Sequence, residues 1–131
     1  MSRQASPPAT ARIVVVDDDD YVREATEMVL AGAGHSVRAT ANGLEALRWL
    51  EEEPWDLVIL DLRMPEIDGP TLYREVLARW PKAAAHVLFM SGMAELFEAD
   101  HAVRALRVPI LLKPFTLEEL SAAVARALAT I

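Results

Sequence analysis

The chain has 131 residues, the size of one ordinary domain. Apolar residues make up 53% of it, enough for a buried core, and because it contains no cysteine, disulfides, zinc fingers, iron–sulfur clusters and thiol catalysis are excluded. The formal net charge of −7 argues against non-specific binding to nucleic acid, and no apolar run approaches the ~18 residues of a membrane span.

The N-terminal residues differ in composition from the rest of the chain. Residues 1–11 contain Pro7-Pro8 and small polar residues, so we expect a disordered tail there and a single folded domain over residues 12–131. These first residues also lack the basic and then apolar layout of a signal peptide. We therefore expect a cytoplasmic protein that does not enter a membrane.

From residue 12 onward, short apolar runs alternate with segments that have helical periodicity. The predicted strands are short and mostly apolar, and they cover residues 12–16, 35–40 (centred on Val37), 56–60, 86–90 and 108–112. The predicted helices have apolar residues at helical spacing and cover residues 20–31, 42–53, 68–80, 95–106 and 116–128.

Local signals refine three of these helices. Asp20 is the expected N-cap of the first, and Leu44, Leu47 and Leu50 form the expected core face of the second. In the last, residues 116–119 have the pattern of a capping box, in which a threonine is followed three residues later by a glutamate.

Five repeats of an apolar strand followed by a helix predict an α/β fold. Strands that are apolar on both faces form parallel sheets covered by helices on either side, the doubly wound arrangement. Right-handed crossovers then place the carboxyl ends of all strands along one edge, where such sheets bind ligands.

The residues at these strand ends are polar and chemically related. Asp17 and Asp18 follow the first strand, Asp61 the third, Ser91 the fourth and Lys113 the fifth. Three carboxylates brought together repel one another unless a cation joins them, and Mg²⁺ prefers such hard oxygen ligands in an open site. The sequence therefore predicts a Mg²⁺ site at this edge.

This set of residues suits phosphoryl transfer to a carboxylate. Aspartate is an established covalent acceptor, and the charge of the transferring group spreads over its equatorial oxygens. One of these oxygens would lie on Mg²⁺, one on Lys113 and one on Ser91. Taken alone, Asp17 to Asp20 has the composition of a solvated acidic turn, but its occurrence in register with Asp61 and Lys113 favours a site.

Four motifs in order resemble the receiver domain of two-component response regulators. They are VVVDDDDYVRE (14–24), VILDLRMPEIDG (58–69), VLFMSG (87–92) and LLKPFT (111–116). The resemblance covers residues 12–128 and implies a flavodoxin-like sheet of strand order 2-1-3-4-5 flanked by five helices.

The resemblance also implies roles for individual residues. Asp61 corresponds to the phosphorylated aspartate, and Asp18, Asp61 and the backbone carbonyl of Arg63 to direct Mg²⁺ ligands, with Asp17 acting through water. Ser91 corresponds to the hydroxyl switch residue, and Lys113 to the lysine that contacts the phosphate before a cis Lys-Pro bond.

Two features depart from the family pattern. Ile110 stands three residues before Lys113, where receivers carry a switch aromatic that swings inward as the hydroxyl engages phosphate. Arg63 and Met93 stand two residues after Asp61 and Ser91, at variable positions that tune the hydrolysis of the aspartyl phosphate in this family.

The first functional hypothesis is therefore a signalling switch rather than an enzyme with an external substrate. Its phosphoryl donor would be a histidine kinase or a histidine phosphotransfer protein, and its own catalysis would be limited to self-phosphorylation and slow self-dephosphorylation. We expect output by contact with a protein target through residues 95–106, strand 108–112 and the final helix, with a homodimer as a further arrangement. The chain would be a stand-alone regulator or one part of a longer protein, such as a hybrid kinase.

Two alternatives belong to other functional classes. The first is a phosphatase of the haloacid dehalogenase type: residues 17–19 contain its D-x-D spacing, but Tyr21 stands where a threonine is expected and there is no room for a cap domain. The second is a degenerate receiver that acts only as an interaction module. Ile110 favours the second, and the intact Asp61, Ser91 and Lys113 argue against it.

Overall fold

The computed structural model describes residues 10–92 and 105–129, without the side chains of residues 83–85. Five strands, all paired in parallel, form one sheet of order β2-β1-β3-β4-β5. Their bounds are β1 Arg12–Val16, β2 Ser36–Thr40, β3 Leu57–Asp61, β4 Val87–Gly92 and β5 Ile110–Lys113. The predicted α/β fold and strand order are confirmed.

Four α-helices and one 3₁₀-helix accompany the strands within the described residues, and the last α-helix follows the last strand. They are α1 Asp20–Gly32, α2 Gly43–Glu52, α3 Gly69–Arg79, the 3₁₀-helix η2 Pro81–His86 and α5 Leu117–Ala129. The fourth predicted helix, at 95–106, falls largely on residues 93–104, and Met93 wholly so, and these lie outside the described residues. No helix in the described part of the chain is long and apolar enough to cross a membrane.

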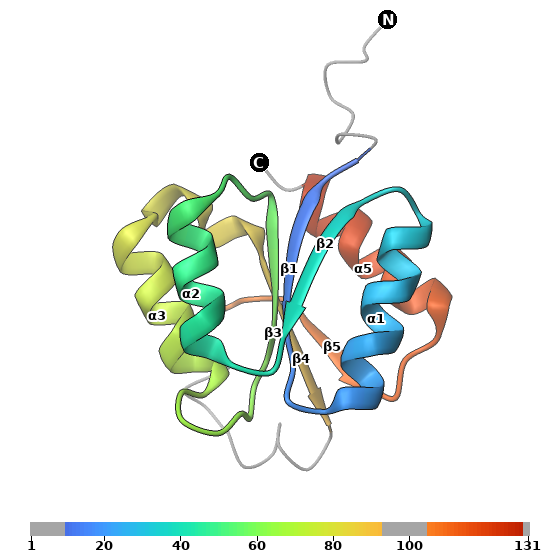
Figure 1. Cartoon of the computed structure of the whole chain (residues 1–131), viewed down its shortest axis with the longest axis horizontal. Helices are drawn as coiled ribbons and strands as arrows, with labels where there is room; N and C mark the ends of the chain where they lie inside the picture. The colour runs from blue at the N-terminus through green and yellow to red at the C-terminus, as the bar shows by residue number, and fades with distance from the viewer. Residues whose placement is uncertain (1–9, 93–104, 130–131) are drawn as a thin grey trace, which may run out of the picture.

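The helices cover both faces of the sheet, as Figure 1 shows, with α2 and α3 on one side and α1 and α5 on the other. Each face has its own buried cluster. The α2–α3 cluster centres on Phe89 and Leu60 from the sheet and Leu72 from α3, and the α1–α5 cluster centres on Ile59 and Leu88. Strand residues alternate between the two clusters because successive side chains point to opposite faces.

Three strands extend beyond their predicted ends. Asp61, Ser91 and Lys113 belong to β3, β4 and β5, and each is paired in register with a residue of a neighbouring strand. Backbone pairing continues past the apolar run because the ladder joins main-chain groups, whatever the side chain. The site residues are therefore held on the sheet itself.

Two predicted helix details are wrong. The N-cap of α1 is Asp19, whose Oδ1 accepts a hydrogen bond from Val22 N at 3.1 Å, and Asp20 lies in the first turn. In α2, Leu44 is 55% exposed, because the buried face is formed by residues 43, 46, 47 and 50. That spacing of three, four and seven residues rotates the core face away from residue 44.

The start of the fold also differs slightly from the expectation. Ala11, placed in the predicted tail, is buried, its amide donates to His35 Nδ1 at 3.0 Å and its carbonyl accepts from Ser36 N at 2.9 Å. The bond from Ser36 N joins main-chain atoms of the two segments, whereas the bond to His35 uses a side chain, and together they hold Ala11 in the fold. Residues 1–9 of the predicted tail lie outside the described residues.

Candidate functional site

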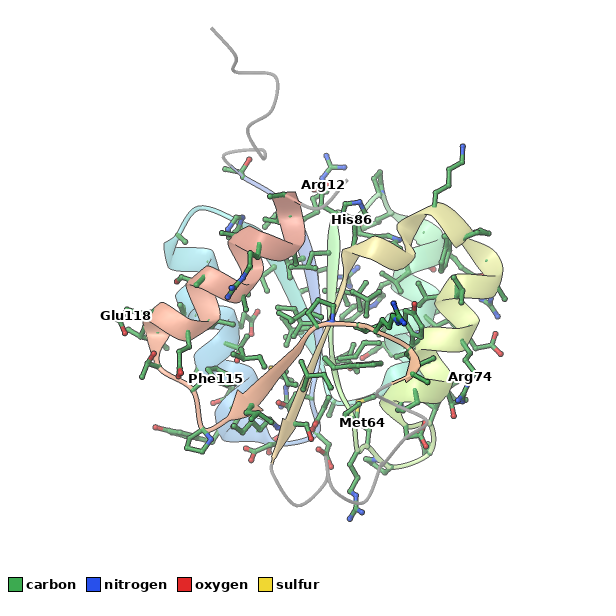
Figure 2. The ribbon with its side chains drawn as sticks, turned by 180° about the vertical axis from the view of Figure 1, so that it is seen from behind. Arg12, Met64, Arg74, His86, Phe115 and Glu118 are labelled. Carbon is green, nitrogen blue, oxygen red and sulfur yellow. The ribbon has the colours of Figure 1, made fainter. Side chains whose placement is uncertain are left out.

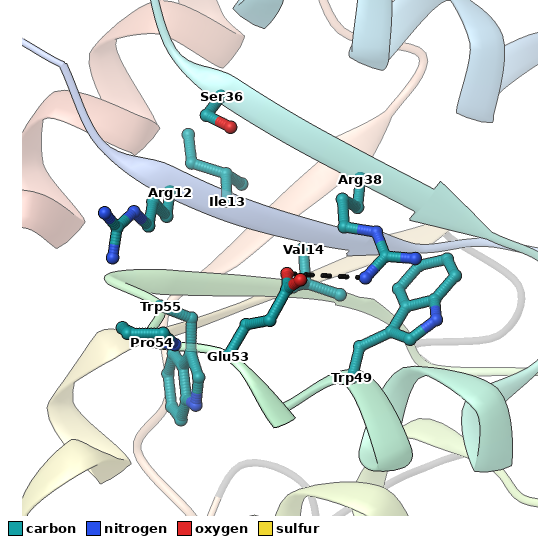
Figure 3. Close-up of a pocket in the computed structure, with 9 residues that line it drawn as sticks. All are labelled: Arg12, Ile13, Val14, Ser36, Arg38, Trp49, Glu53, Pro54 and Trp55. Atoms are coloured by element: carbon teal, nitrogen blue, oxygen red, sulfur yellow. Dashed lines mark hydrogen bonds and ion pairs between the residues drawn. The ribbon is translucent and has the colours of Figure 1, made fainter. Parts of the chain in front are cut away.

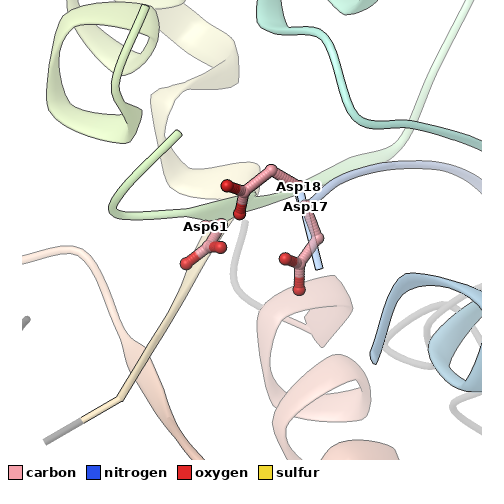
Figure 4. A group of neighbouring side chains, drawn as sticks. All are labelled: Asp17, Asp18 and Asp61. Atoms are coloured by element: carbon pink, nitrogen blue, oxygen red, sulfur yellow. The ribbon is translucent and has the colours of Figure 1, made fainter. Parts of the chain in front are cut away.

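The carboxyl edge of the sheet gathers the predicted acidic residues, as Figure 4 shows for Asp17, Asp18 and Asp61. One carboxylate oxygen from each of the three lies within 4.8 Å of the others. Asp17 and Asp61 are buried, whereas Asp18 is exposed to solvent. The cluster therefore has a buried floor and one open side.

Asp17 is positioned by contacts on both sides of the end of β1. Its amide donates to Thr40 O at 3.1 Å, its Oδ1 accepts from Asp19 N at 2.9 Å, and its carbonyl accepts from Arg23 Nη1 at 3.0 Å. Arg23 was not among the residues predicted for the site. Its position three residues after Asp20 on α1 was a sequence signal for an ion pair, and the two side chains do pair at 2.7 Å.

Lys113 joins the two buried carboxylates across the sheet. Its Nζ lies 3.0 Å from Asp17 Oδ2, and 3.3 Å from both Asp17 Oδ1 and Asp61 Oδ2, to which it donates hydrogen bonds. The Lys113-Pro114 peptide bond that follows is cis, as the resemblance implied. Lys113 thus contacts Asp61, the residue that the sequence predicts to be the phosphoryl acceptor.

The pKa values of this group reflect burial and mutual charge. Burial first, and then the neighbouring Asp17 carboxylate, raise the pKa of Asp61 from its ordinary 3.8 to about 8, although Lys113 opposes the shift. Burial alone would lower the pKa of Lys113, but the hydrogen bonds and charges of Asp17 and Asp61 outweigh it and raise that pKa. In the absence of further positive charge, Asp61 therefore holds its proton at neutral pH.

The residues present fit a divalent cation. With all groups ionised, three carboxylates and one ammonium leave two net negative charges. Asp61 Oδ1 is buried and has no hydrogen-bond partner among the described residues. A buried oxygen without a partner is costly in a protein interior, and a metal ion at the open side would remove that cost.

Ser91 lies beside this cluster on β4, in register with Leu112 of β5, next to Lys113. It is fully buried, and its Oγ donates to Gly92 O at 2.8 Å. The hydroxyl is thus oriented toward its own strand, and only a rotation about χ1 would redirect it.

Ile110 and Arg63 occupy the positions that depart from the family pattern. Ile110 is partly buried, pairs with Phe89 and packs against the α2–α3 cluster, so an aliphatic side chain fills the space beside the strand. Arg63 is exposed in the loop that follows β3. Both lie close to the site in the chain without belonging to its buried floor.

Gly69 contributes to the site through the backbone. A Cβ at this position would collide with the carbonyl oxygen of Asp61 and with Leu62 Cα, and Gly69 N donates to Leu62 O at 3.0 Å. Only glycine permits this close approach of the α3 start to the end of β3. The Asp68-Gly69 pair signalled a helix start in the sequence, but its contact with Asp61 is a tertiary feature.

Comparison with known proteins gives the same family as the motifs. The family model of the response regulator receiver domain matches residues 13–125. The chain belongs to this family. Receiver domains are signalling switches, which favours that hypothesis over the phosphatase alternative.

Curated relatives of the receiver domain are longer proteins. The sensor kinase CckA of Brucella abortus is 37% identical over 117 residues, which cover 88% of this chain and 12% of that protein. The regulatory protein AtoC of Escherichia coli is 36% identical over 120 residues, which cover 92% of this chain and 26% of that protein. The chain spans about a quarter or less of the length of these two relatives.

Solved structures agree with this assignment. The receiver domain of NtrX from Brucella abortus superposes with a TM-score of 0.80 at 28% identity, covering 91% of this chain and 99% of that one. The chemotaxis response regulator CheY4 of Vibrio cholerae gives a TM-score of 0.78 at 26% identity, with 90% and 98% covered.

Proposed function

We propose that Asp61 accepts a phosphoryl group from the phosphohistidine of a histidine kinase or a histidine phosphotransfer protein. The observation that carries the proposal is the Asp61 carboxylate itself. It is buried, one oxygen has no partner among the described residues, and the other lies 3.3 Å from Lys113 Nζ. An oxygen held in this way is available to a ligand atom that arrives from the open side.

The transfer is a displacement at phosphorus. An Asp61 oxygen forms the new P–O bond while the P–N bond to the donor histidine breaks, and the imidazole nitrogen keeps the electron pair and takes up a proton. The nucleophile must be ionised, and Lys113 favours the ionised carboxylate while Asp17 and burial oppose it. Positioning and charge, rather than a neighbouring general base, would thus prepare Asp61.

We further propose that the resident metal is Mg²⁺, held by Asp18, Asp61 and the backbone carbonyl of Arg63, with Asp17 acting through water. The three clustered carboxylates and the unpartnered Asp61 Oδ1 support this ligand set. Bound Mg²⁺ supplies positive charge that favours ionised Asp61 and balances the phosphoryl oxygens.

Lys113 and Ser91 would bind the transferred group. Lys113 already contacts both buried carboxylates, so a phosphoryl oxygen on Asp61 would arrive within its reach. Ser91 would rotate from the Gly92 carbonyl to donate to another phosphoryl oxygen. Both movements change contacts at the β4–β5 ends, beside Ile110, and would alter that surface without an aromatic swing.

The output of the switch would be a change in protein contacts at β5, α5 and residues 95–106. Most of residues 95–106 lie outside the described residues. The target would be a downstream protein or a second copy of the chain. Among the relatives are a sensor kinase and a regulatory protein, so the domain would work alone or as the receiver of a longer cytoplasmic protein, including a hybrid kinase. The acidic domain itself would not bind nucleic acid.

The test is phosphorylation by acetyl phosphate, followed by intact-mass measurement. The protein should gain one phosphoryl group in Mg²⁺ and little or none in EDTA, and Asp61→Asn should gain none. Asp68→Asn is the matched control, because Asp68 Oδ1 caps α3 by accepting from Thr71 N at 2.8 Å and asparagine caps equally well. Labelling of Asp61→Asn would remove Asp61 from its role, and an unlabelled wild type would favour the degenerate module.

A further inference from the structure

A second cavity lies at the opposite end of the sheet from Asp61. It has a volume of about 420 Å³ and is bounded by β1, β2 and the segment from Trp49 to Trp55; we call it the basal cavity. Figure 2 shows Arg12, which lines it, at the far end of the molecule from Met64 and Phe115, which follow β3 and β5. Its volume falls in the range of roughly 300–1,000 Å³ that small-molecule sites occupy.

Aromatic side chains form one wall of the basal cavity. Trp49 comes from the last turns of α2, and Trp55 lies just before β3, as the close-up in Figure 3 shows. Trp55 is held in place by an edge-to-face contact with Trp80, whose ring centroid lies 5.9 Å away. Arg38 lies over the ring of Trp49, whereas the partly exposed Trp55 offers apolar indole surface to a planar ligand.

The lining of the basal cavity carries a net positive charge. Two arginines and one glutamate among the lining residues leave one net positive charge, although the whole chain carries −7. Arg38 is already engaged, since its guanidinium lies 3.9 Å from the centre of the Trp49 ring and 3.4 Å from Glu53 Oε1. It therefore contributes a fixed cation–π wall rather than a vacant donor.

Arg12 is different. Its backbone amide donates to Asp56 Oδ2 at 2.8 Å, but within residues 10–92 and 105–129 its guanidinium has no hydrogen bond or ion pair. Arg12 is the first residue of β1 and pairs in register with Ser36, so its position at the mouth of the basal cavity is set by the sheet. The sheet fixes the Arg12 backbone, and its exposed guanidinium presents a forked set of donors to a carboxylate or phosphate.

We propose that the basal cavity binds a small aromatic anion, with its planar ring against Trp55, beside the Arg38-covered ring of Trp49, and its acidic group on Arg12. The site is independent of Asp61, because it lies at the amino ends of the strands and shares no residue with the acidic cluster. It would let a metabolite of this class bind a receiver domain away from the phosphorylation edge.

The test uses 2-naphthoate as the probe and two analogues that each lack one feature. 2-Naphthamide keeps the rings without the charge, and cyclohexanecarboxylate keeps the charge without the aromatic rings. Binding is followed by the ¹H–¹⁵N signals of the tryptophan indoles, assigned with single Trp→Phe variants. The signals of Trp49 and Trp55 should shift saturably with 2-naphthoate, and both analogues should bind more weakly.

Three variants identify the charge that matters. Arg12→Gln should weaken binding of 2-naphthoate roughly tenfold, as expected for the loss of a charge-assisted hydrogen bond. Glu53→Gln should tighten it roughly threefold, because a neighbouring negative charge is removed. Arg74→Gln removes an exposed arginine on α3 that does not line the basal cavity, and should leave binding unchanged.

Several outcomes would overturn the proposal. They are the absence of a saturable shift, equal binding of either analogue, and equal loss of affinity in Arg12→Gln and Arg74→Gln. A change of oligomeric state in Arg12→Gln without any ligand would assign the basal cavity to a second copy of the chain instead. Phosphorylation of Asp61 by acetyl phosphate should be normal in all three variants, which separates this test from that of the acceptor site.

Discussion

At the scale of single residues, the groups around Asp61 act in opposite directions on the protonated and the ionised form of its carboxyl group. Burial and the Asp17 carboxylate raise its pKa to about 8, while Lys113 at 3.3 Å favours the ionised form. A metal ion beside the unpartnered Oδ1 would add to the effect of Lys113 and favour the carboxylate that attacks phosphorus. The cation would thus increase the ionised, nucleophilic fraction of the proposed acceptor.

This arrangement predicts how stability depends on pH without metal. In the folded chain Asp61 keeps its proton up to about pH 8, whereas the unfolded chain loses it near 3.8. Between these values the folded state binds more protons, so the free energy of unfolding should fall as pH rises through this window. Urea unfolding in EDTA should show this fall in the wild type, and a smaller one in Asp61→Asn.

The metal supplies the internal control. Added Mg²⁺ should restore stability at the alkaline end of the window in the wild type, because it favours the ionised carboxylate, and should do less in Asp61→Asn. Parallel pH profiles for the two proteins in EDTA would show that Asp61 does not carry the shifted proton.

At the scale of elements, the start of α5 is defined by a complete capping box. Glu119 N donates to Thr116 Oγ1 at 3.0 Å, and Thr116 N donates to Glu119 Oε1 at 2.8 Å. The box begins three residues after Lys113 and thereby fixes where the chain turns from the site into the helix. Two otherwise unpaired amides are satisfied by two side chains.

Removing either half of the box should destabilise the domain by about 1 kcal/mol. Thr116→Ala, Glu119→Ala and the double variant form a cycle, measured by urea unfolding, in which the double variant should cost less than the sum of the two. Glu118→Ala is the control, since it removes an equally exposed charge from the same turn without a bond to Thr116. Strict additivity in the cycle would mean that the two bonds form independently.

At the scale of the whole molecule, one sheet carries two separate cores. Trp49, Trp55 and Trp80 all pack against the α2–α3 cluster, so tryptophan fluorescence reports that face alone. Leu88 is buried in the α1–α5 cluster on the opposite face. A structural change at the carboxyl edge can alter both clusters only if the sheet transmits the change from one face to the other.

Leu88→Ala tests this coupling. The substitution should lower the free energy of unfolding by about 2–5 kcal/mol, because it leaves a cavity in a closely packed core. Fluorescence and far-ultraviolet circular dichroism should report the same shift if the domain unfolds as one unit. Met28→Ala, at a side chain 74% exposed on α1, should change stability little. Separate transitions for the two signals would show that the faces unfold independently.

Much of this architecture could be predicted from the pattern of residues alone. Apolar runs between helical segments located all five strands, and their parallel arrangement placed Asp17, Asp61, Ser91 and Lys113 at one edge. Helix capping was less predictable in an acidic run, where several neighbouring side chains can accept the same amide, and Asp19 rather than Asp20 caps α1. Leu44 is exposed although it is apolar, because the buried face of α2 is formed by residues 43, 46, 47 and 50.

The sequence by itself therefore determined which chemical groups meet at the edge of the sheet, since strand periodicity and the parallel topology are local and repetitive properties. Only the tertiary structure decided how far each of these groups is buried and which partner it contacts. It buried Asp17 and Asp61 but left Asp18 exposed, and it brought Lys113 onto a carboxylate 96 residues away in the chain. It also placed Arg12, whose guanidinium has no partner in the described residues, in the lining of a cavity that contains two indoles. Burial and long-range pairing depend on how distant segments pack, and no local pattern of residues encodes that packing.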